Sequence, residues 1–263
     1  MTDRATTLDH AVAIVDAGAA LGVVARVMGG VGIALHCPSS ADGPFRRDYG
    51  DLDVVVDRRG GRKHADALFA GLDYRPDLEF NTINGPEGRR RYVSGDGGKV
   101  DVFVGAFRMC HELPLEERLT ADAPTVTLAD LFLTKAQIFE LTDKDAIDLA
   151  CLLLDHELAD HDDDRLNHRR VAELTGADWG LWRTVTRSLE RVRATVRGLA
   201  LRDDQAATIH ARIDELQDVL DRAPKSTRWK LRARVGDHVR WYELPEDPDR
   251  GSGMAHASNG RMA

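Results

Sequence analysis

Apolar residues in the first part of the chain follow helical spacing in some segments and extended spacing in others. Residues 8–21 are apolar and alanine-rich with helical periodicity, and Gly22 follows them as a stop signal. Short β-branched runs predict buried strands at residues 23–28 and at Asp51–Val56. Residues 32–36 predict the start of a short helix between these two strands.

The alternation of helix and strand continues over the next fifty or so positions. Residues 38–44 are rich in proline, serine and glycine and predict a loop. Residues 64–72 have helical periodicity. Two short apolar runs, residues 90–93 and Lys99–Val104, flank the glycine-rich segment 94–98 and predict a β-hairpin.

After about Thr120 glycine becomes rarer and helical patterns dominate. Thr127 is expected to cap a helix over residues 128–141, and Asp143 to cap one that runs to about His156. Residues 179–199 and 203–220 are long, charged and periodic and predict two amphipathic helices. Residues 230–242 alternate loosely and predict extended chain.

These patterns divide the chain into three parts. Residues 1–120 are expected to form an α/β (α+β) core, and residues 121–245 a mostly helical C-terminal region. Residues 246–263 are rich in glycine, serine and asparagine with few apolar side chains, and we expect them to be disordered.

Charge is distributed unevenly along the chain. The 263 residues carry a formal net charge of −8, which argues against a protein built uniformly to coat nucleic acid. Residues 222–240 reverse the sign, with arginine and lysine on both sides of Trp229. A solvated protein surface is the commoner explanation for such a run, and phosphate contact with base stacking on RNA is the alternative.

Neither a membrane segment nor a disulfide framework is indicated. No apolar run approaches the roughly 20 residues that a membrane span needs, and the first residues lack the pattern of a signal peptide. We therefore expect a soluble, cytoplasmic protein. Cys37, Cys110 and Cys151 are far apart and form no CxxC pair, so neither disulfides nor a zinc site is indicated, and we expect three buried thiols.

Three carboxylates provide the candidate chemistry. Asp51 and Asp53 lie two apart at the start of a predicted strand, so their side chains point to the same face and repel each other unless a cation lies between them. Mg²⁺ prefers carboxylate oxygens together with phosphate oxygens. Asp101 lies inside a later apolar strand, where a carboxylate is costly unless it is paired. If the two strands are neighbours, Asp101 completes a metal-binding triad. The alternative for Asp51 and Asp53 is a polar strand edge or turn cap.

A glycine pair, Gly29-Gly30, lies between the first predicted strand and the following helix. Glycine at this position lets a phosphate approach the backbone, and the N–H groups of a helix N-terminus favour anions. Taken alone, a glycine pair after a strand is most often only a turn.

The order of these features, Gly29-Gly30, then Asp51-x-Asp53, then Asp101, resembles the active site of the polymerase-β type nucleotidyltransferase superfamily. The resemblance implies a mixed sheet flanked by helices and two Mg²⁺ ions held by the three aspartates, with an NTP as co-substrate. The separation of Gly30 from Asp51 is longer here than in compact members of the superfamily.

Further residues extend the resemblance to the AbiEii-like and aminoglycoside nucleotidyltransferase-like branches. Arg47 precedes Asp51 by four positions, as in an R-x-x-x-D-I-D run. Lys135, followed by the block Lys144-Asp145-x-x-Asp148, is similar to an L-x-x-K…K-D-x-x-D pair of helices. The resemblance implies that Lys135 contacts the nucleotide phosphates. Asp145 and Asp148, which share a helix face, are expected to orient either Lys135 or the carboxylate triad; the alternative for these two aspartates is a capped, solvated helix start.

The implied activity is transfer of a nucleoside monophosphate from an NTP to a hydroxyl acceptor, with release of pyrophosphate. A tRNA end, a protein hydroxyl and an aminoglycoside-like small molecule are all compatible acceptors. Two other functions remain open: a non-catalytic nucleotide-binding or partner-binding protein on the same fold, and the toxin of a toxin–antitoxin pair with an antitoxin as partner. Arg89-Arg90-Arg91 either touches a triphosphate or edges the hairpin.

Overall fold

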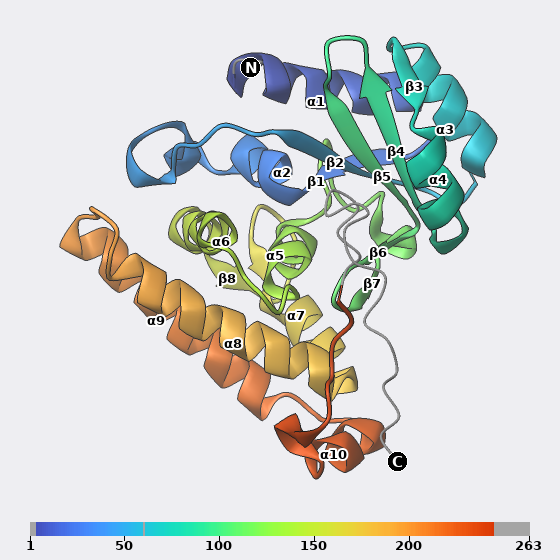
Figure 1. Ribbon diagram of the computed structural model, residues 1–263. Helices are drawn as coiled ribbons and strands as arrows, with labels where there is room; N and C mark the ends of the chain where they lie inside the picture. The colour runs from blue at the N-terminus through green and yellow to red at the C-terminus, as the bar shows by residue number, and fades with distance from the viewer. Residues whose placement is uncertain (1–3, 60, 245–263) are drawn as a thin grey trace, which may run out of the picture.

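The computed structural model of the protein describes residues 4–59 and 61–244. Its centre is a mixed five-stranded sheet in the order β1-β2-β5-β4-β3 (Figure 1). The strands are β1 (Ala25–Met28), β2 (Asp51–Val56), β3 (Tyr74–Pro76), β4 (Arg89–Ser94) and β5 (Lys99–Val104). The β2–β5 pair is parallel and the other three pairs are antiparallel, so β5 occupies the middle of the sheet between its hairpin partner β4 and the more distant β2.

The two faces of the sheet are buried against different helices. Alternate side chains of β2 and β5, including Leu52, Val54 and Val102, join one apolar cluster with α1 (Arg4–Ala20) and α3 (Gly61–Ala70). Val55 and Phe103 point to the opposite face and join a larger cluster with the helices of the C-terminal half. Because side chains two apart share a face, Asp53 and Asp101 lie on this second face, toward the helical half.

The second face is covered by α2 (Gly29–His36), α5 (Leu128–Ala136) and α6 (Asp143–Asp155). Behind them pack α7 (His168–Ala177), α8 (Trp179–Val196), α9 (Asp203–Arg222) and the short α10 (Thr227–Ala233), as Figure 1 shows. Smaller elements connect the layers: α4 (Leu78–Asn84), the pair β6 (Ala106–Arg108) and β7 (Glu112–Pro114), and the pair β8 (Leu158–Ala159) and β9 (Leu166–Asn167). The large cluster contains residues from both halves of the chain.

Several sequence predictions are confirmed. The strands at Asp51–Val56 and Lys99–Val104 have the predicted bounds, and β4 and β5 form the predicted hairpin. The chain turns at Gly22 with φ of 71° directly after α1, a conformation that glycine adopts without strain. The predicted combination of a mixed sheet, flanking helices and a helical C-terminal half is also observed.

Other predictions were wrong in their bounds or type. The helix capped by Thr127 ends at Ala136, and α6 is capped by Thr142 rather than by Asp143. Residues 230–242 were expected to be extended, but their first part belongs to α10, where the Ser226 hydroxyl accepts a hydrogen bond from the backbone N–H of Trp229. The expected disordered segment, residues 246–263, lies outside the described residues.

No helix within residues 4–59 and 61–244 has both the length and the apolar composition that crossing a bilayer requires. All three cysteines are buried and free, as their spacing predicted. One oxygen of Asp155 and the sulfurs of Cys37 and Cys151 lie within 4.8 Å of one another. The Asp155 carboxylate already accepts hydrogen bonds from the backbone N–H and hydroxyl of Ser39. The hydrogen bond with Cys151, together with burial, raises the pKa of Cys37, so its thiol stays protonated and is a poor metal ligand.

Candidate functional site

Asp53 and Asp101 are direct neighbours across the parallel β2–β5 pair. The register pairs Asp53 with Asp101, and the antiparallel β1–β2 pair places Met28 on the other side of Asp53. Gly29 follows Met28, so the start of α2 lies beside Asp53. The sheet therefore brings together three features that the sequence separates by more than seventy positions.

The Asp53 carboxylate lies in an environment that favours its protonated form. Burial, followed by the negative charges of Asp101 and Asp51, raises the pKa of Asp53 to about 6 against the opposing effect of Lys135 and Arg89. A carboxylate whose ionisation is opposed in this way gains from a nearby cation. The electrostatics of Asp53 thus suit a bound divalent ion.

Asp101 is held by two arginines of the adjacent strand β4. Its Oδ2 accepts a hydrogen bond of 2.6 Å from Nη2 of Arg89, and its Oδ1 accepts one of 2.7 Å from Nε of Arg91. Asp101 is only 6% exposed. Burial acts to raise the pKa of Asp101, but the hydrogen bonds and charges of Arg91 and Arg89 outweigh it and hold the pKa below its ordinary value. Both oxygens of this carboxylate therefore already have cationic partners.

The two glycines at the start of α2 leave room for functional side chains. A Cβ atom at Gly29 would lie 2.2 Å from Oδ2 of Asp53, and the φ of Gly29 is 67°, which side-chain-bearing residues rarely adopt. A Cβ atom at Gly30 would lie 1.9 Å from Nη2 of Arg47. The α2 N-terminus begins after Met28 without a side-chain cap. Its first N–H groups are therefore available to an anion.

A buried network of charges extends from Gly30 to Lys135. Arg47 donates two hydrogen bonds to Asp148, of 2.8 Å from Nε and 2.5 Å from Nη2. Nζ of Lys135 lies 2.6 Å from Oδ1 of Asp145 and 3.5 Å from Oδ2 of Asp148. Burial acts to lower the pKa of Lys135, but these carboxylates outweigh it and raise the pKa, so Lys135 remains a cation.

Lys135 and Asp53 line the same cavity. This candidate site, called the catalytic cavity below after the activity proposed for it, has a volume of about 210 Å³, and its walls also include Gly29, Arg89 and Asp145. Asp51, which is exposed, does not line it. Asp51 instead lines a separate cavity of about 380 Å³ beside α1, together with Tyr49 and Tyr74.

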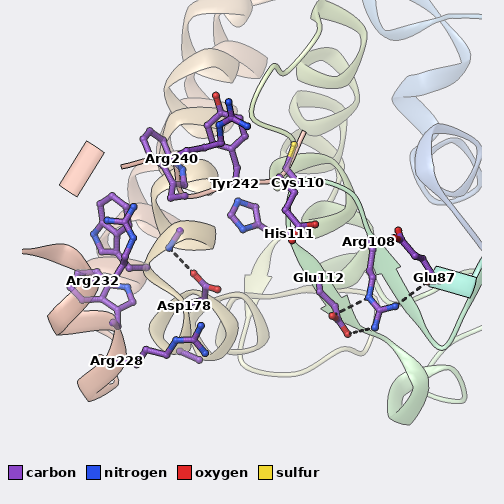
Figure 2. A pocket seen from close by; sticks show the side chains of 16 residues that line it. Glu87, Arg108, Cys110, His111, Glu112, Asp178, Arg228, Arg232, Arg240 and Tyr242 are labelled. Atoms are coloured by element: carbon purple, nitrogen blue, oxygen red, sulfur yellow. Dashed lines mark hydrogen bonds and ion pairs between the residues drawn. The ribbon is translucent and has the colours of Figure 1, made fainter. Parts of the chain in front are cut away.

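Two further cavities lie next to the catalytic cavity, one after the other. The middle cavity, of about 480 Å³, shares Arg89, Phe103 and Met109 with it. The outer cavity, of about 710 Å³, shares Arg108, Tyr242 and other residues with the middle one. Figure 2 shows the outer cavity, with arginines on two sides and His111 and Cys110 at its base.

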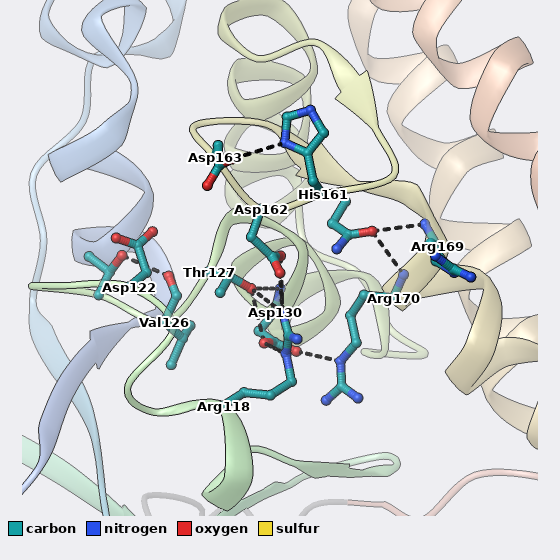
Figure 3. Close-up of polar contacts among 12 residues, drawn as sticks. Arg118, Asp122, Val126, Thr127, Asp130, His161, Asp162, Asp163, Arg169 and Arg170 are labelled. Atoms are coloured by element: carbon teal, nitrogen blue, oxygen red, sulfur yellow. Dashed lines mark hydrogen bonds and ion pairs between the residues drawn. The ribbon is translucent and has the colours of Figure 1, made fainter.

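The helix that carries Lys135 is fixed by a second buried polar network (Figure 3). Asp130 of α5 is 1% exposed and accepts hydrogen bonds of 2.9 Å from Nε of Arg118 and 3.0 Å from Nε of Arg170. Arg118 also contacts Asp162, and Thr127 caps the helix beneath them. Because a buried carboxylate with two guanidinium partners is costly to separate from either, the network holds α5 in position.

The structure brings most of the residues predicted from the sequence into one place. Gly29, Asp53 and Lys135 line the catalytic cavity, and Gly30 lies behind it against the side chain of Arg47. Both Asp145 and Asp148 contact Lys135.

The remaining predicted residues are placed less simply. Asp101 adjoins Asp53 but faces two arginines, and Asp51 lies at the exposed start of β2. The roles of Arg91 and of the Arg47–Asp148 pair were not identified from the sequence. The alternation of Arg89 and Arg91 on one strand was a signal that their side chains share a face.

A scan against protein-family models gives no match to this chain, and a search of the curated proteins finds no matching sequence. Function therefore has to be inferred from the geometry and chemistry of the site.

Proposed function

We propose that this protein is a Mg²⁺-dependent nucleotidyltransferase, which transfers a nucleoside monophosphate from an NTP to a hydroxyl acceptor and releases pyrophosphate. The observation that carries the proposal is the catalytic cavity itself. It combines the Asp53 carboxylate, the unhindered backbone of Gly29 at a helix start and the Lys135 cation, with Asp101 in register beside Asp53. These are the groups needed to hold a metal-bound triphosphate.

Asp53 is the carboxylate of the cavity that would hold a divalent cation, since a cation would offset the burial that raises its pKa. Asp51, two residues earlier on β2 but in the neighbouring cavity beside α1, would join it only by turning toward Asp53. Asp101 fits as a third ligand only when one of its arginine contacts opens. When bound, the metal ions would neutralise phosphate charge and make the acceptor hydroxyl more acidic.

The residues of the chain position the triphosphate in this proposal. The uncapped N–H groups of Gly29 and Gly30 donate hydrogen bonds to phosphate oxygens, and the absence of side chains permits close approach. Lys135 supplies a fixed positive charge because Asp145 and Asp148 keep it ionised and oriented. Little covalent chemistry is required from the protein, since positioning and charge neutralisation carry most of the rate in such transfers.

Arg89 links the two parts of the site. It contacts Asp101 and also lines both the catalytic and the middle cavity. A triphosphate in the catalytic cavity competes with Asp101 for this guanidinium, because phosphate is also a good bidentate partner. Movement of Arg89 onto phosphate leaves Oδ2 of Asp101 with only the longer hydrogen bond, of 3.3 Å, from Nη2 of Arg91. That oxygen can then take the proton of the acceptor hydroxyl, directly or through a water.

The test is a transfer assay with purified protein, Mg²⁺ and each α-³²P-labelled NTP, in the presence of total tRNA, a protein mixture or an aminoglycoside panel. We expect label on one acceptor class with the wild type and none with the Asp51→Asn/Asp53→Asn variant. The matched control is Asp218→Asn, which removes an exposed carboxylate of α9 that pairs only with Arg222 among the described residues. If that control also fails to transfer label, the loss in the double variant does not show that Asp51 and Asp53 act in transfer.

A non-catalytic nucleotide-binding protein is the second candidate, favoured by the double arginine clamp on Asp101. In that case Arg89 and Arg91 stay bound to Asp101, and only the residues that bind phosphate have a role. Calorimetry with Mg²⁺ and NTP then gives binding that Asp53→Asn weakens, whereas no acceptor becomes labelled. Absence of both binding and transfer would exclude both functions.

A further inference from the structure

The outer cavity is walled by an aromatic cluster that no part of the catalytic site uses. Trp179 and Trp182 of α8 lie 6.4 Å apart between ring centroids, and Trp182 lies 5.3 Å from Trp229 of α10. Trp241 lies 5.8 Å from Trp179, and Tyr242 lies 5.5 Å from Trp241. Of these rings, all but that of Trp182 line the cavity, so four aromatic side chains border a space of about 710 Å³. Three of them already have a partner over one face: Arg232 lies over Trp179, Lys225 over Trp229, and Phe139 stacks on Tyr242.

Guanidinium groups accompany these rings. Arg228, Arg232 and Arg240 line the cavity, and Figure 2 shows them on the side formed by α10 and the segment that follows it. Arg232 lies over the ring of Trp179 and donates to backbone carbonyls, so it is structurally engaged. Arg228 and Arg240 are exposed, and within residues 4–59 and 61–244 neither has a carboxylate partner.

The acidic residues of the cavity are largely committed elsewhere. Glu112 pairs with Arg108 at 3.0 Å, and Asp178 caps α8 by accepting the backbone N–H groups of Gly180 and Leu181. Near α10, Asp237 pairs with Arg183. Glu87 and Glu243 remain on the side toward the middle cavity. The wall formed by α10 is therefore positive, with Lys230 and Arg234 adding to it.

The outer cavity adjoins the middle cavity, and the middle cavity adjoins the catalytic cavity, because each pair shares lining residues. Arg108, Arg240 and Tyr242 belong to both the outer and the middle cavity, and Arg89 and Met109 to both the middle and the catalytic cavity. The three cavities thus follow one another from α10 to Asp53. A small-molecule acceptor would fill only one of them, whereas an extended polymer would occupy all three.

We propose that the acceptor is a single-stranded nucleic acid whose bases stack against the aromatic rings of the outer cavity. Its phosphates contact Arg228 and Arg240, and its terminal hydroxyl reaches the catalytic cavity beside Asp53. Stacking on aromatic rings combined with phosphate contacts is how proteins hold single strands without reading their sequence. A polycationic aminoglycoside is disfavoured, because it would meet guanidinium groups at the α10 wall and already paired carboxylates opposite.

The inference rests on the proposed nucleotidyl transfer and specifies its acceptor. In that step the hydroxyl oxygen of the strand forms a bond to the α-phosphorus of the NTP while the α–β phosphoanhydride bond breaks. Pyrophosphate leaves with the bonding electron pair, and the hydroxyl proton passes to Asp101 or to water. No oxidant or further reactant is needed.

The test measures binding directly, without NTP. Fluorescently labelled single-stranded RNA, single-stranded DNA and duplex DNA of equal length are titrated with the full-length protein and followed by anisotropy. We expect binding of a single strand, and the RNA and DNA arms identify which. Arg228→Ala/Arg240→Ala should weaken it by at least about tenfold and reduce the slope of log Kd against log salt by about 1.4, since each phosphate contact contributes roughly 0.7 for single strands.

The matched control is Arg197→Ala/Arg202→Ala, which removes equal charge at the turn between α8 and α9, away from all three cavities. If this control weakens strand binding equally, net charge explains the effect, and the proposal that the strand binds in the outer cavity is overturned. Trp229→Phe should retain binding and Trp229→Leu should lose it by about tenfold, because a base can stack on phenylalanine but not on leucine. Equal binding by these two variants would exclude stacking at α10.

The outcomes separate this inference from the proposed function. Transfer of label to a small molecule, with no binding of any single strand, overturns the nucleic-acid acceptor and leaves nucleotidyl transfer intact. Strand binding that depends on Arg228 and Arg240, without transfer under any condition, retains the binding cavity and overturns the enzymatic activity. Tighter binding to duplex than to single strand would contradict the stacking geometry.

Discussion

A side chain at Gly29 and the carboxylate of Asp53 cannot occupy the site together, because a Cβ atom at Gly29 would lie 2.2 Å from Oδ2 of Asp53. The glycine thereby determines where the carboxylate lies. Its backbone φ of 67° adds a second reason for glycine at this position. The two effects can be separated, since Gly22 has a similar φ of 71° but nothing within 4 Å of its Cβ position.

We expect Gly29→Ala to abolish nucleotide binding, whereas Gly22→Ala leaves it unchanged. Both variants carry the cost of a left-handed alanine, about 1–2 kcal/mol. Only Gly29→Ala also displaces Asp53. Calorimetric titration with Mg²⁺ and NTP, alongside urea unfolding of both variants, measures the difference. Equal loss of nucleotide affinity in the two variants would show that backbone strain, and not the Asp53 contact, is responsible.

Asp53→Asn is expected to stabilise the protein at neutral pH while removing activity. Burial raises the pKa of Asp53 to about 6, above its ordinary value of 3.8, so the folded protein binds this proton more tightly than the unfolded chain. The resulting stability is fully present below pH 3.8 and is lost as the pH rises through 6. At pH 7.5, above both pKa values, the variant should gain about 3 kcal/mol, at about 1.4 kcal/mol per unit of pKa. Urea midpoints at pH 7.5 and 4.5 test this, and the exposed Asp51→Asn serves as control.

Mg²⁺ should raise the melting temperature more at pH 7.5 than at pH 5. A cation at Asp53 must displace the proton below a pKa of about 6, so its affinity falls as the pH is lowered through that value. Differential scanning fluorimetry with and without Mg²⁺ at both pH values provides the measurement. The pH dependence should disappear in Asp53→Asn, and an unchanged dependence in that variant would locate the metal elsewhere.

Asp148→Ala should destabilise the protein strongly. The carboxylate is 4% exposed and holds Arg47 by two hydrogen bonds, so its removal leaves a partly buried guanidinium without this partner. Breaking one side of a buried pair costs about 3–5 kcal/mol. Asp218→Ala removes the partner of Arg222 in an exposed pair and should cost less than about 1 kcal/mol. Urea unfolding of both variants gives the comparison; similar losses would mean that the Arg47 pair contributes no more than a surface contact.

Arg91→Ala and Arg90→Ala should differ although the residues are adjacent. Arg91 holds Asp101, whereas Arg90 points to the opposite face of β4. Without Arg91 the pKa of Asp101 should rise, because burial is then opposed by Arg89 alone. The stability contributed by this depressed pKa is present above the ordinary Asp pKa and lost on acidification, so Arg91→Ala should weaken the protein at pH 7 and less so near pH 3. Unfolding curves at both pH values decide it; Arg90→Ala should show no such pH effect.

The part of the fold best predicted from the sequence is the part with strong local patterns. The strand at Asp51–Val56 and the hairpin around Gly95 have short β-branched runs and a glycine-rich turn, and both were predicted. The missed helices begin after capping side chains. Asp77 accepts from Phe80 at the start of α4, and Asn167 caps α7. These capping residues were readable in the sequence.

Other features depended on contacts that the sequence does not show. The helix after Thr127 ends at Ala136, and Phe139 just beyond it stacks on Tyr242, more than a hundred positions away. The carboxylate and glycine motifs indicated which groups gather at the site. They did not indicate that β4 would lie beside Asp101 and supply its arginines, because that depends on strand order and register.

The central position of β5 also has a consequence for synthesis of the chain. β2 and β4 do not pair with each other, and both require β5 between them, although β5 is the last of the five strands to emerge from the ribosome. Before β5 is made, Asp53 can pair only with Met28 of β1, and Asp101, Lys135 and Asp148 follow later. The loop that closes between β2 and β5 is long, so the pairing is entropically costly and slow compared with the hairpins. A nascent chain consequently has no assembled site until α6, which carries Asp145 and Asp148, has been made.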